Sequence, residues 1–221
     1  MLSIIIPARN EEQYISSCLN SIYYAANKAY LSIEIIVICD YSFDKTSIIA
    51  ESFGCKVFNV KYSSRSKARN YGAIQAKGDF LVFIDADTII SEDFFLISFK
   101  NLDDFGNSFW YRIKPLEKSI LASIYFFLYN FISKFYPLLS PVIFTPKSYF
   151  LESEGFNESL NSLEDHFFLH KAWKINKCKF NNTSVYTSVR RIKKYGISTT
   201  AIHTILAIKN PYEFKWGTIN E

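Results

Sequence analysis

Apolar runs alternate with segments of helical periodicity over roughly the first 90 residues. The runs at 2–6, 33–39, 55–60 and 80–84 predict four strands, and the apolar spacing predicts helices over about 11–29, 45–53 and 66–77. Runs with so few polar positions indicate strands covered on both faces, which favours a mostly parallel central sheet flanked by helices. We therefore expect an α/β protein whose first half looks like a nucleotide-binding domain.

Beyond residue 87 the pattern is less regular, and the stretch 119–133 contains no charged residue. As a helix this stretch would be about 22 Å long at about 1.5 Å per residue. That is too short to cross a hydrocarbon layer of about 30 Å. Its polar side chains form one narrow stripe, so two interpretations stay open: a buried helix, or a helix that lies in a membrane interface or against a lipid-bearing substrate.

The composition narrows the class of protein. The chain has 221 residues, of which 49% are hydrophobic and 21% charged, and this excludes a disordered protein. Its length suggests one large domain or one and a half, and we expect a single domain over 1–221 with a helical or irregular C-terminal part. The formal net charge of +4 comes without dense basic clusters, so we expect no nucleic acid partner. Four dispersed cysteines and the lack of an export signal at the first residues indicate a cytoplasmic protein.

Two aspartates, Asp85 and Asp87, directly follow the apolar run 80–84. Ligands of open α/β sheets bind at the carboxyl ends of the strands, so this Asp-x-Asp turn is expected to face a cleft. Hard carboxylate oxygens suit Mg²⁺ or Mn²⁺, which would clamp a diphosphate. The alternative is a helix cap or a solvated turn, because so short a pattern is common by chance.

Five further segments accompany this turn: SIIIPARNEE at 3–12, EIIVICDYSFDKT at 34–46, SRSKARNYGAIQAKGD at 64–79, EGFNE at 154–158 and LEDHFFL at 163–169. In this order and spacing they resemble the family 2 glycosyltransferases of the GT-A fold, and the resemblance covers roughly the first 90 residues well. The chain departs from the family pattern at Tyr41 and Phe43, where small residues are usual, and at Ser64 and Glu154, where glycine is common. These departures affect the nucleotide pocket and the backbone path of the later turn.

The resemblance implies an inverting enzyme that moves a sugar from a nucleotide-diphosphate sugar, with residues 1–90 as the donor half and 91–221 as the acceptor half. It implies that Asp87 is the principal ligand of Mg²⁺ or Mn²⁺, and that Asp85 contacts the ribose or supports the metal. The other residues that it assigns to donor binding are Pro7, Asn10, Glu11, Asp40, Asp44, Arg69, Arg190 and Arg191.

Some of these assignments have structural alternatives. Asp44 would equally well cap the helix expected near residue 45, and Glu11 would suit a helix N-terminus electrostatically. Arg190 and Arg191 belong to a charge run that would also form a solvated helix start or a patch for anionic lipid.

Glu164 and Asp165 are, by the same resemblance, the catalytic acids, with Asp165 as the base that deprotonates the acceptor. Residues 162–165 also have the sequence of a capping box that opens a helix. The acceptor implied is a saccharide or a lipid-linked molecule, and a lipid phosphate, already ionised at neutral pH, would need no base. A cell-envelope polysaccharide role is expected as well. The apolar stretch and the basic tail of the chain predict peripheral contact with the inner face of the cell membrane through 119–146.

Two other functions deserve comparison. A sugar nucleotidyltransferase would normally carry a Gly-rich basic loop after the first strand, where residues 7–12 hold one arginine and two acids instead. A catalytically inactive nucleotide-sugar-binding protein would keep the fold and lose turnover. Donor hydrolysis in the presence of Mn²⁺ distinguishes this last case from an active enzyme.

Overall fold

The computed structural model describes residues 1–102 and 107–209, with side-chain surroundings through residue 200. Its first half contains the four predicted strands, now β1 (Leu2–Ala8), β2 (Ile33–Asp40), β3 (Lys56–Val60) and β4 (Phe80–Ile84). They pair in parallel in the order β3-β2-β1-β4. The helices α1 (Ile15–Lys28), α2 (Thr46–Ser52) and α3 (Arg65–Gln75) connect them, as the periodicity predicts.

The second half extends the same sheet with strands that the sequence pattern did not single out. These are β5 (Thr88–Ile90), β6 (Ser108–Pro115), β7 (Val142–Pro146) and β8 (Cys178–Thr187). Across the described residues the strand order is β3-β2-β1-β4-β7-β6-β8-β5, and four of the seven pairings are parallel. The α/β fold class is therefore confirmed, and the sheet is parallel in its first half and mixed beyond β4.

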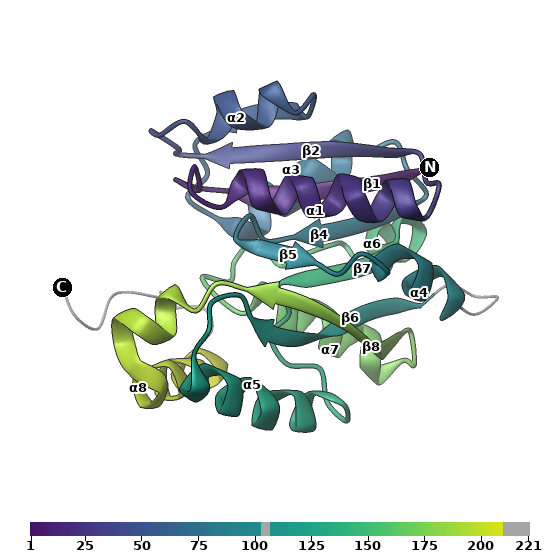
Figure 1. Cartoon of the computed structure of the whole chain (residues 1–221). Coiled ribbons are helices and arrows are strands. Elements are labelled where there is room, and N and C mark those ends of the chain that lie inside the picture. The colour runs from purple at the N-terminus through teal and green to yellow at the C-terminus, as the bar shows by residue number, and fades with distance from the viewer. Residues whose placement is uncertain (103–106, 210–221) are drawn as a thin grey trace.

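Five more helices lie in the second half of the described chain: α4 (Phe94–Lys100), α5 (Ile120–Ser133), α6 (Lys147–Glu152), α7 (Glu164–Lys174) and α8 (Arg190–Lys209). The helix α8 is kinked at Gly196, where φ is +79°. Figure 1 shows α5 and α8 side by side at the end of the molecule opposite α2, and the two helices are in contact. Within the part of the chain that is described, no helix combines the length and apolar character needed to cross a membrane.

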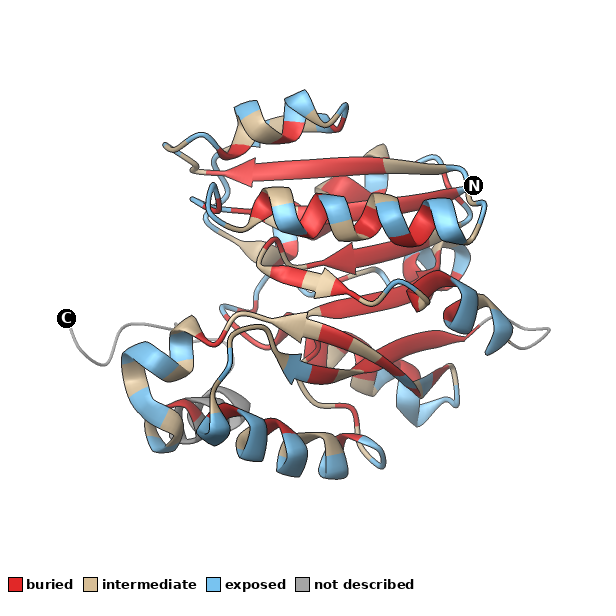
Figure 2. Cartoon of the chain, in the orientation of Figure 1, coloured by how far each residue is buried: buried red, intermediate tan, exposed pale blue. Residues whose placement is uncertain are grey.

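The core consists of two layers because successive side chains of a strand point to opposite faces of the sheet. On β1, Ile4 and Ile6 pack in a cluster with α1, α4 and α5, whereas Ile5 packs in a second cluster with α3, α6 and α7. The strands β1, β2, β4 and β7 are accordingly buried along most of their length (Figure 2). Gly72 lets α3 approach the sheet, since a Cβ there would lie 2.5 Å from Cγ2 of Ile5. This packing fixes the carboxyl edge of the sheet, where the polar turns gather.

Candidate active site

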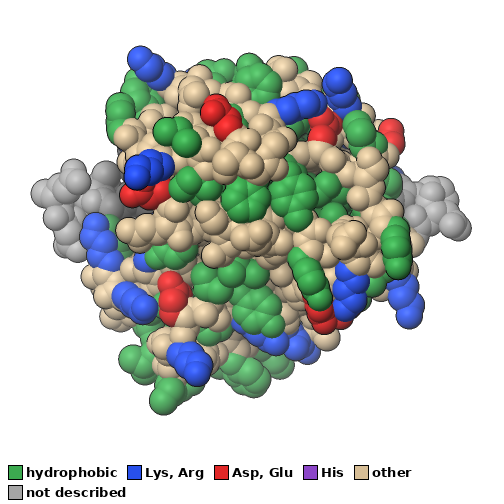
Figure 3. Space-filling view, turned by 45° about the horizontal axis from the view of Figure 1, so that its top comes forward, with side chains coloured by type: hydrophobic (Ala, Val, Ile, Leu, Met, Phe, Trp, Pro, Cys, Tyr) green, Lys and Arg blue, Asp and Glu red, His purple; other side chains and the backbone are tan. Residues whose placement is uncertain are grey.

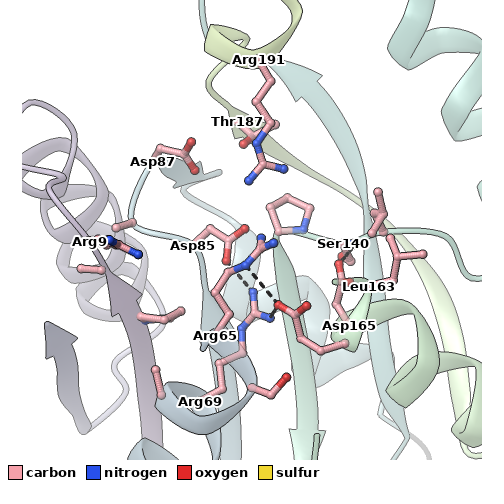
Figure 4. A pocket seen from close by; sticks show the side chains of 18 of the residues that line it. Arg9, Arg65, Arg69, Asp85, Asp87, Ser140, Leu163, Asp165, Thr187 and Arg191 are labelled. Carbon is pink, nitrogen blue, oxygen red and sulfur yellow. Dashed lines mark hydrogen bonds and ion pairs between the residues drawn. The ribbon is translucent and has the colours of Figure 1, made fainter. Parts of the chain in front are cut away.

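A cavity of about 980 Å³ opens at the carboxyl ends of β1, β2 and β4. Its walls are the loop before α3, the turn after β4, the inner side of α5, the loop before α7 and the beginning of α8. In Figure 4, Asp85 and Asp87 of the turn after β4, Arg65 of α3 and Arg191 of α8 point into this shared space. The volume is at the upper end of the range of small-molecule pockets, about 300–1,000 Å³.

The structure brings most of the sequence-predicted residues to this cavity. Those that line it are Pro7, Glu11, Asp40, Arg69, Asp85, Asp87, Glu164, Asp165, Arg190 and Arg191. Asn10 and Asp44 are not among the lining residues.

Asn10 and Asp44 instead join the loop after β1 to the loop after β2. Asn10 Oδ1 accepts the N–H of Phe43 at 2.9 Å. Asp44 accepts the N–H of Glu12 and that of Thr46, the first residue of α2, each at 3.0 Å. Burial opposes ionisation of Asp44, but the hydrogen bonds from Thr46 and from the N–H of Glu12 outweigh it and lower the pKa. Asn10 and Asp44 therefore hold together the two loops at the rim of the cavity and do not line it.

Asp40 holds a loop at the edge of the cavity. Its Oδ1 accepts the N–H groups of Tyr62 and Ser63 at 2.7 and 2.9 Å, and its Oδ2 accepts that of Ser64 at 2.9 Å. A carboxylate has about four lone-pair positions, so these bonds leave Asp40 little capacity for a ligand. Ser64 in turn caps α3, because its Oγ accepts the N–H of Lys67. Asp40 therefore fixes the path of the chain from β3 into α3.

Arg69 lies at the centre of a buried charge network. Its guanidinium donates to Asp85 Oδ1 at 2.6 Å and to Glu164 Oε1 at 2.5 Å, and its side chain is 3% exposed. It also lies over the ring of Phe156, 5.4 Å from the centroid. Burial disfavours the charged guanidinium, but the negative charges of Asp85 and Glu164 outweigh it and raise the pKa of Arg69. Arg69 thus joins α3, the turn after β4 and α7.

Asp87 lies on the other side of the Asp-x-Asp turn, beside Arg190. Arg190 donates to both carboxylate oxygens of Glu11, at 2.8 and 2.6 Å, and lies 3.1 Å from Asp87 Oδ2. Burial and the negative charge of Asp85 raise the pKa of Asp87 to about 6 even though Arg190 opposes the shift. A divalent cation would relieve this crowding of carboxylates, so Asp85 and Asp87 fit a metal such as Mg²⁺ or Mn²⁺. Most ligands would then come from water or from phosphate oxygens. In the described chain no group of three or more His, Cys, Asp or Glu forms a complete metal site.

Glu164 and Asp165 open α7 and have opposite protonation tendencies. Burial opposes ionisation of Glu164, but Arg65 and Arg69 beside it outweigh burial and lower its pKa. Burial and the negative charge of Glu164 raise the pKa of Asp165, which keeps a hydrogen bond from the N–H of Ser140 at 2.8 Å. A buried carboxyl of raised pKa in a cavity is a candidate general base.

The capping box expected at 162–165 does not form. The residue that precedes α7 is Leu163, which has a left-handed φ of +62° and makes no side-chain capping bond. Ser162 Oγ is buried and has no hydrogen-bond partner in the described part of the chain. The left-handed backbone at a leucine is strained, and such strain clusters at functional sites. Glu164 and Asp165, which follow this residue directly, both line the cavity.

Asn70 holds the turn at 154–158 in place. Asn70 Oδ1 accepts the N–H of Phe156 at 2.9 Å, and its Nδ2 donates to the carbonyl of Phe156 and to Glu158. Glu154 and Gly155 both have positive φ, at +63° and +66°. Asn70, on α3, therefore ties this turn to the first half of the chain.

Several cavity residues were not predicted from the sequence. Arg9 and Arg65 line the cavity, and Arg65 Nε lies 3.5 Å from Glu164. Arg65 could have been predicted from its position, because it lies at the start of α3, shortly before Arg69, and both follow the third strand. Ser140 contributes a backbone N–H, which no sequence pattern reveals.

Comparison with known sequences identifies what the chain is similar to. Residues 3–114, about half of the chain, match the family model described as "Glycosyl transferase family 2". A 4,4'-diaponeurosporenoate glycosyltransferase of Staphylococcus haemolyticus is 36% identical over 99 residues, which are 42% of this chain and 25% of that protein. An uncharacterized glycosyltransferase of Haemophilus influenzae is 25% identical over 229 residues, covering 94% of this chain and 74% of that protein. The chain thus spans only a quarter of the first of these relatives.

Solved structures share the fold. The S. aureus TarS fragment 1–349 in complex with UDP-GlcNAc has a TM-score of 0.67 at 24% identity, over 86% of this chain and 58% of that one. The mannosyltransferase PcManGT from Pyrobaculum calidifontis, in complex with GDP-Man and Mn²⁺, has a TM-score of 0.73 at 16% identity, over 96% of this chain and 62% of that one. At these identities the similarity establishes the architecture and not the substrate.

Proposed function

Because the chain belongs to glycosyl transferase family 2, we propose that its cavity transfers a sugar from a nucleotide-diphosphate sugar to an acceptor, with inversion at the anomeric carbon. One observation carries the proposal: Asp87 and Asp165, which are far apart in the sequence, face one cavity at the carboxyl edge of the sheet. The nucleotide sugars bound by TarS and by PcManGT support a donor of this class.

The donor is proposed to bind along residues 1–90. Pro7 and Glu11 line this part of the cavity, and Asp40 holds the loop that borders it. The diphosphate carries two or more negative charges, and Arg190 and Arg191 are the proposed phosphate contacts at the beginning of α8. Arg69 supports the site through its carboxylate partners.

Asp85 and Asp87 are the proposed holders of Mg²⁺ or Mn²⁺. When bound, the cation would neutralise the diphosphate that leaves. The Mn²⁺ in the PcManGT complex supports this use of a metal. Arg190 supplies positive charge to Asp87 and Glu11 beside this proposed metal position.

Asp165 is the proposed base, with Glu164 as its ionised neighbour. The acceptor hydroxyl oxygen attacks the anomeric carbon, its proton passes to Asp165, and the bond from that carbon to the diphosphate oxygen breaks on the opposite side. The raised pKa of Asp165 favours proton uptake, and the hydrogen bond from the N–H of Ser140 fixes the carboxylate that receives the proton.

The acceptor is proposed to bind along residues 91–221, as a saccharide or lipid-linked molecule of the cell envelope. Tyr125, Phe126 and Tyr129 of α5 form an aromatic wall on this side of the cavity. Tyr129 is held by its hydroxyl, which donates to the carbonyl of Leu139. TarS is named as a poly(ribitol-phosphate) beta-N-acetylglucosaminyltransferase, which supports an acceptor of the envelope type. The reaction is proposed to occur in the cytoplasm at the inner face of the membrane.

Thermal unfolding with UDP-, GDP- and dTDP-sugars, each with Mn²⁺ or EDTA, tests the proposal. A ligand at about 100 times its Kd stabilises a protein by about 2.7 kcal/mol. For a chain of this length that corresponds to a rise in Tm of about 5–10 °C. The anomeric configuration of the product, measured by NMR, then tests inversion. No rise in Tm with any nucleotide sugar in Mn²⁺ would contradict donor binding, and retention of configuration would contradict the single displacement.

A further inference from the structure

The helix α5 is held in a fixed orientation by its inner side. The side chain of Asn130 is bonded to both backbone polar groups of Ile113 in β6. It donates to the carbonyl at 2.7 Å and accepts the N–H at 2.9 Å. Ala122 and Phe126 are buried, and Trp110 donates to the carbonyl of Ser133 at 2.8 Å. These contacts determine which side chains of α5 face away from the protein.

The side that faces away is apolar. We call it the outer face of α5, and it comprises Ile120, Leu121, Ile124, Phe127, Leu128, Phe131, Ile132 and Phe135, the last of which follows the helix. Each of these side chains is exposed, between 54% and 81% of its maximum. Figure 2 shows α5 exposed along this side, and Figure 3 shows hydrophobic side chains at the lower edge of the molecule, where α5 lies in Figure 1. Eight neighbouring apolar side chains form a patch of the kind that marks an interaction surface.

The charged residues that border the outer face along the sequence are lysines, and the nearest acid, Glu117, is bonded to the hydroxyl of Ser188 and the N–H of Val189. No Asp or Glu occurs from residue 118 to residue 151, while Lys118 and Lys134 stand at the two ends of the helix. The neighbouring helix α8 adds the exposed Lys193 and Lys194, and residues 188–212 contain no acid either. An apolar face bordered by lysines complements a bilayer with anionic headgroups.

The same pattern disfavours a second copy of the chain as the occupant. In a two-fold symmetric pair each contact is repeated in reverse, so antiparallel α5 helices would bring Lys118 of one copy toward Lys134 of the other. Like charges placed opposite each other are unfavourable, and anionic lipid removes this conflict.

We propose that the outer face of α5 docks on an anionic lipid bilayer, with the helix lying flat in the interface and the lysines of α5 and α8 contacting the headgroups. Its 14 residues correspond to about 21 Å, which suits a helix parallel to the surface and not one that crosses it. Because Tyr125 and Phe126 of the same helix line the cavity, docking holds the cavity close to the bilayer. The docking needs neither donor nor turnover, so its test is independent of the proposed transfer reaction.

Flotation with vesicles tests the docking surface. The full chain is mixed with vesicles of phosphatidylcholine alone or with about 30% phosphatidylglycerol, at low and high salt, without nucleotide. The test variant is Ile124→Ser/Ile132→Ser, in which both side chains are 54% exposed. The matched control is Ile48→Ser/Ile74→Ser, on α2 and α3, where the side chains are 65% and 70% exposed. Far-UV circular dichroism and Tm show whether each variant is folded, and the exposure of all four positions favours folding.

The proposal predicts binding of the wild type and the control to phosphatidylglycerol vesicles, weaker at high salt, and about tenfold or greater loss in the test variant. Lys193→Gln/Lys194→Gln is expected to lose several-fold in binding at low salt. Three outcomes overturn the proposal: a wild type that stays in the soluble fraction, binding that the α5 substitutions leave unchanged, or a dimer in analytical ultracentrifugation that those substitutions dissociate. The last result would assign the outer face to a second copy.

Discussion

Replacing Arg69 with methionine tests the charge network that holds the cavity together. Methionine keeps much of the apolar volume of the side chain and removes the charge that pairs with Asp85 and Glu164. Arg69 is 3% exposed and Glu164 is 4% exposed at the side chain, so water cannot replace the lost partner. Breaking a buried ion pair in this way costs about 3–5 kcal/mol. For a chain of this length we expect Tm to fall by about 6–20 °C.

The loss should depend on pH in a defined direction. In the wild type the pKa of Glu164 is below its ordinary value, so its pairing stabilises the fold above the unfolded pKa and the contribution is lost as pH falls through the folded pKa. In Arg69→Met, Glu164 keeps Arg65 but loses the charge and the hydrogen bond of Arg69, so its pKa is higher than in the wild type. Ionisation of Glu164 then stabilises the fold less at neutral pH than it does in the wild type, and protonation in acid removes this difference. The difference in the free energy of unfolding between the two proteins should therefore shrink from pH 7.5 toward acid pH.

The matched control is Arg65→Met. Arg65 lies near the same carboxylate, with Nε 3.5 Å from Glu164 Oε1, but its side chain is 39% exposed. Arg65 is partly solvated and lies farther from the carboxylate than Arg69, which is buried and 2.5 Å from it, so the control should lose less stability than Arg69→Met. Urea unfolding followed by tryptophan fluorescence at several pH values measures both variants. Equal losses in the two variants, or a loss in Arg69→Met that does not vary with pH, would refute the reasoning.

Three further substitutions test other parts of the site. Asp40→Asn replaces one acceptor oxygen with an N–H donor, so we expect a loss of about 1–3 kcal/mol in urea unfolding and weaker donor binding by calorimetry. Unchanged stability would mean that its backbone bonds do not hold the loop. Gly155→Ala places a Cβ 2.8 Å from Asn70 Oδ1 at a φ of +66°, and we expect the free energy of unfolding to fall by about 1–3 kcal/mol. An unchanged free energy of unfolding would show that the turn adapts to the extra methyl group. Arg190→Gln removes the positive charge beside Asp87, so Mn²⁺ should bind several-fold more tightly in an EPR titration without nucleotide. Weaker Mn²⁺ binding in this variant would argue that Asp85 and Asp87 are not the metal ligands.

The first half of the fold follows closely from the sequence because its strands are covered on both faces. The predicted strand at 80–84 coincides with β4 (Phe80–Ile84), and the run at 33–39 differs from β2 (Ile33–Asp40) by one residue. Such continuous apolar runs can be recognised in the sequence without knowledge of the strands with which they pair. The predicted helix at 11–29 begins later, at Ile15, because residues 11–14 form a turn that supports the rim of the cavity.

The second half was harder to predict because its strands depend on partners distant in the sequence. β7 (Val142–Pro146) is a five-residue segment between prolines, yet it pairs with both β4 and β6 in the middle of the sheet. β8 (Cys178–Thr187) contains adjacent asparagines and a shifted register against β6. Local patterns of this kind do not distinguish a strand from a loop.

Site residues were predictable where they directly follow a strand. Their roles were less predictable where a later loop folds back onto the end of that strand. Asp85 and Asp87 lie at the cavity because parallel strands end at one edge of the sheet. Asp40 also follows a strand, but the loop after β3 folds back onto its carboxylate. The opposite pKa shifts of Glu164 and Asp165 arise from burial and from arginines of α3, which adjacent sequence positions do not reveal.

The most direct test of the account is to measure donor binding and sugar transfer separately in Asp87→Asn and Asp165→Asn, with Asp79→Asn as the control. Asp79 precedes β4 at the opposite end of the strand, and its side chain is 83% exposed. Calorimetry with the nucleotide sugar that stabilises the wild type, in Mn²⁺, measures binding, and product formation with a saccharide or lipid-linked acceptor measures transfer. We predict that Asp87→Asn loses Mn²⁺-dependent binding, that Asp165→Asn binds the donor and loses transfer by at least about 100-fold, and that the control retains both. Wild-type binding in Asp87→Asn, or wild-type transfer to a hydroxyl acceptor in Asp165→Asn, would contradict the division of roles between these two carboxylates.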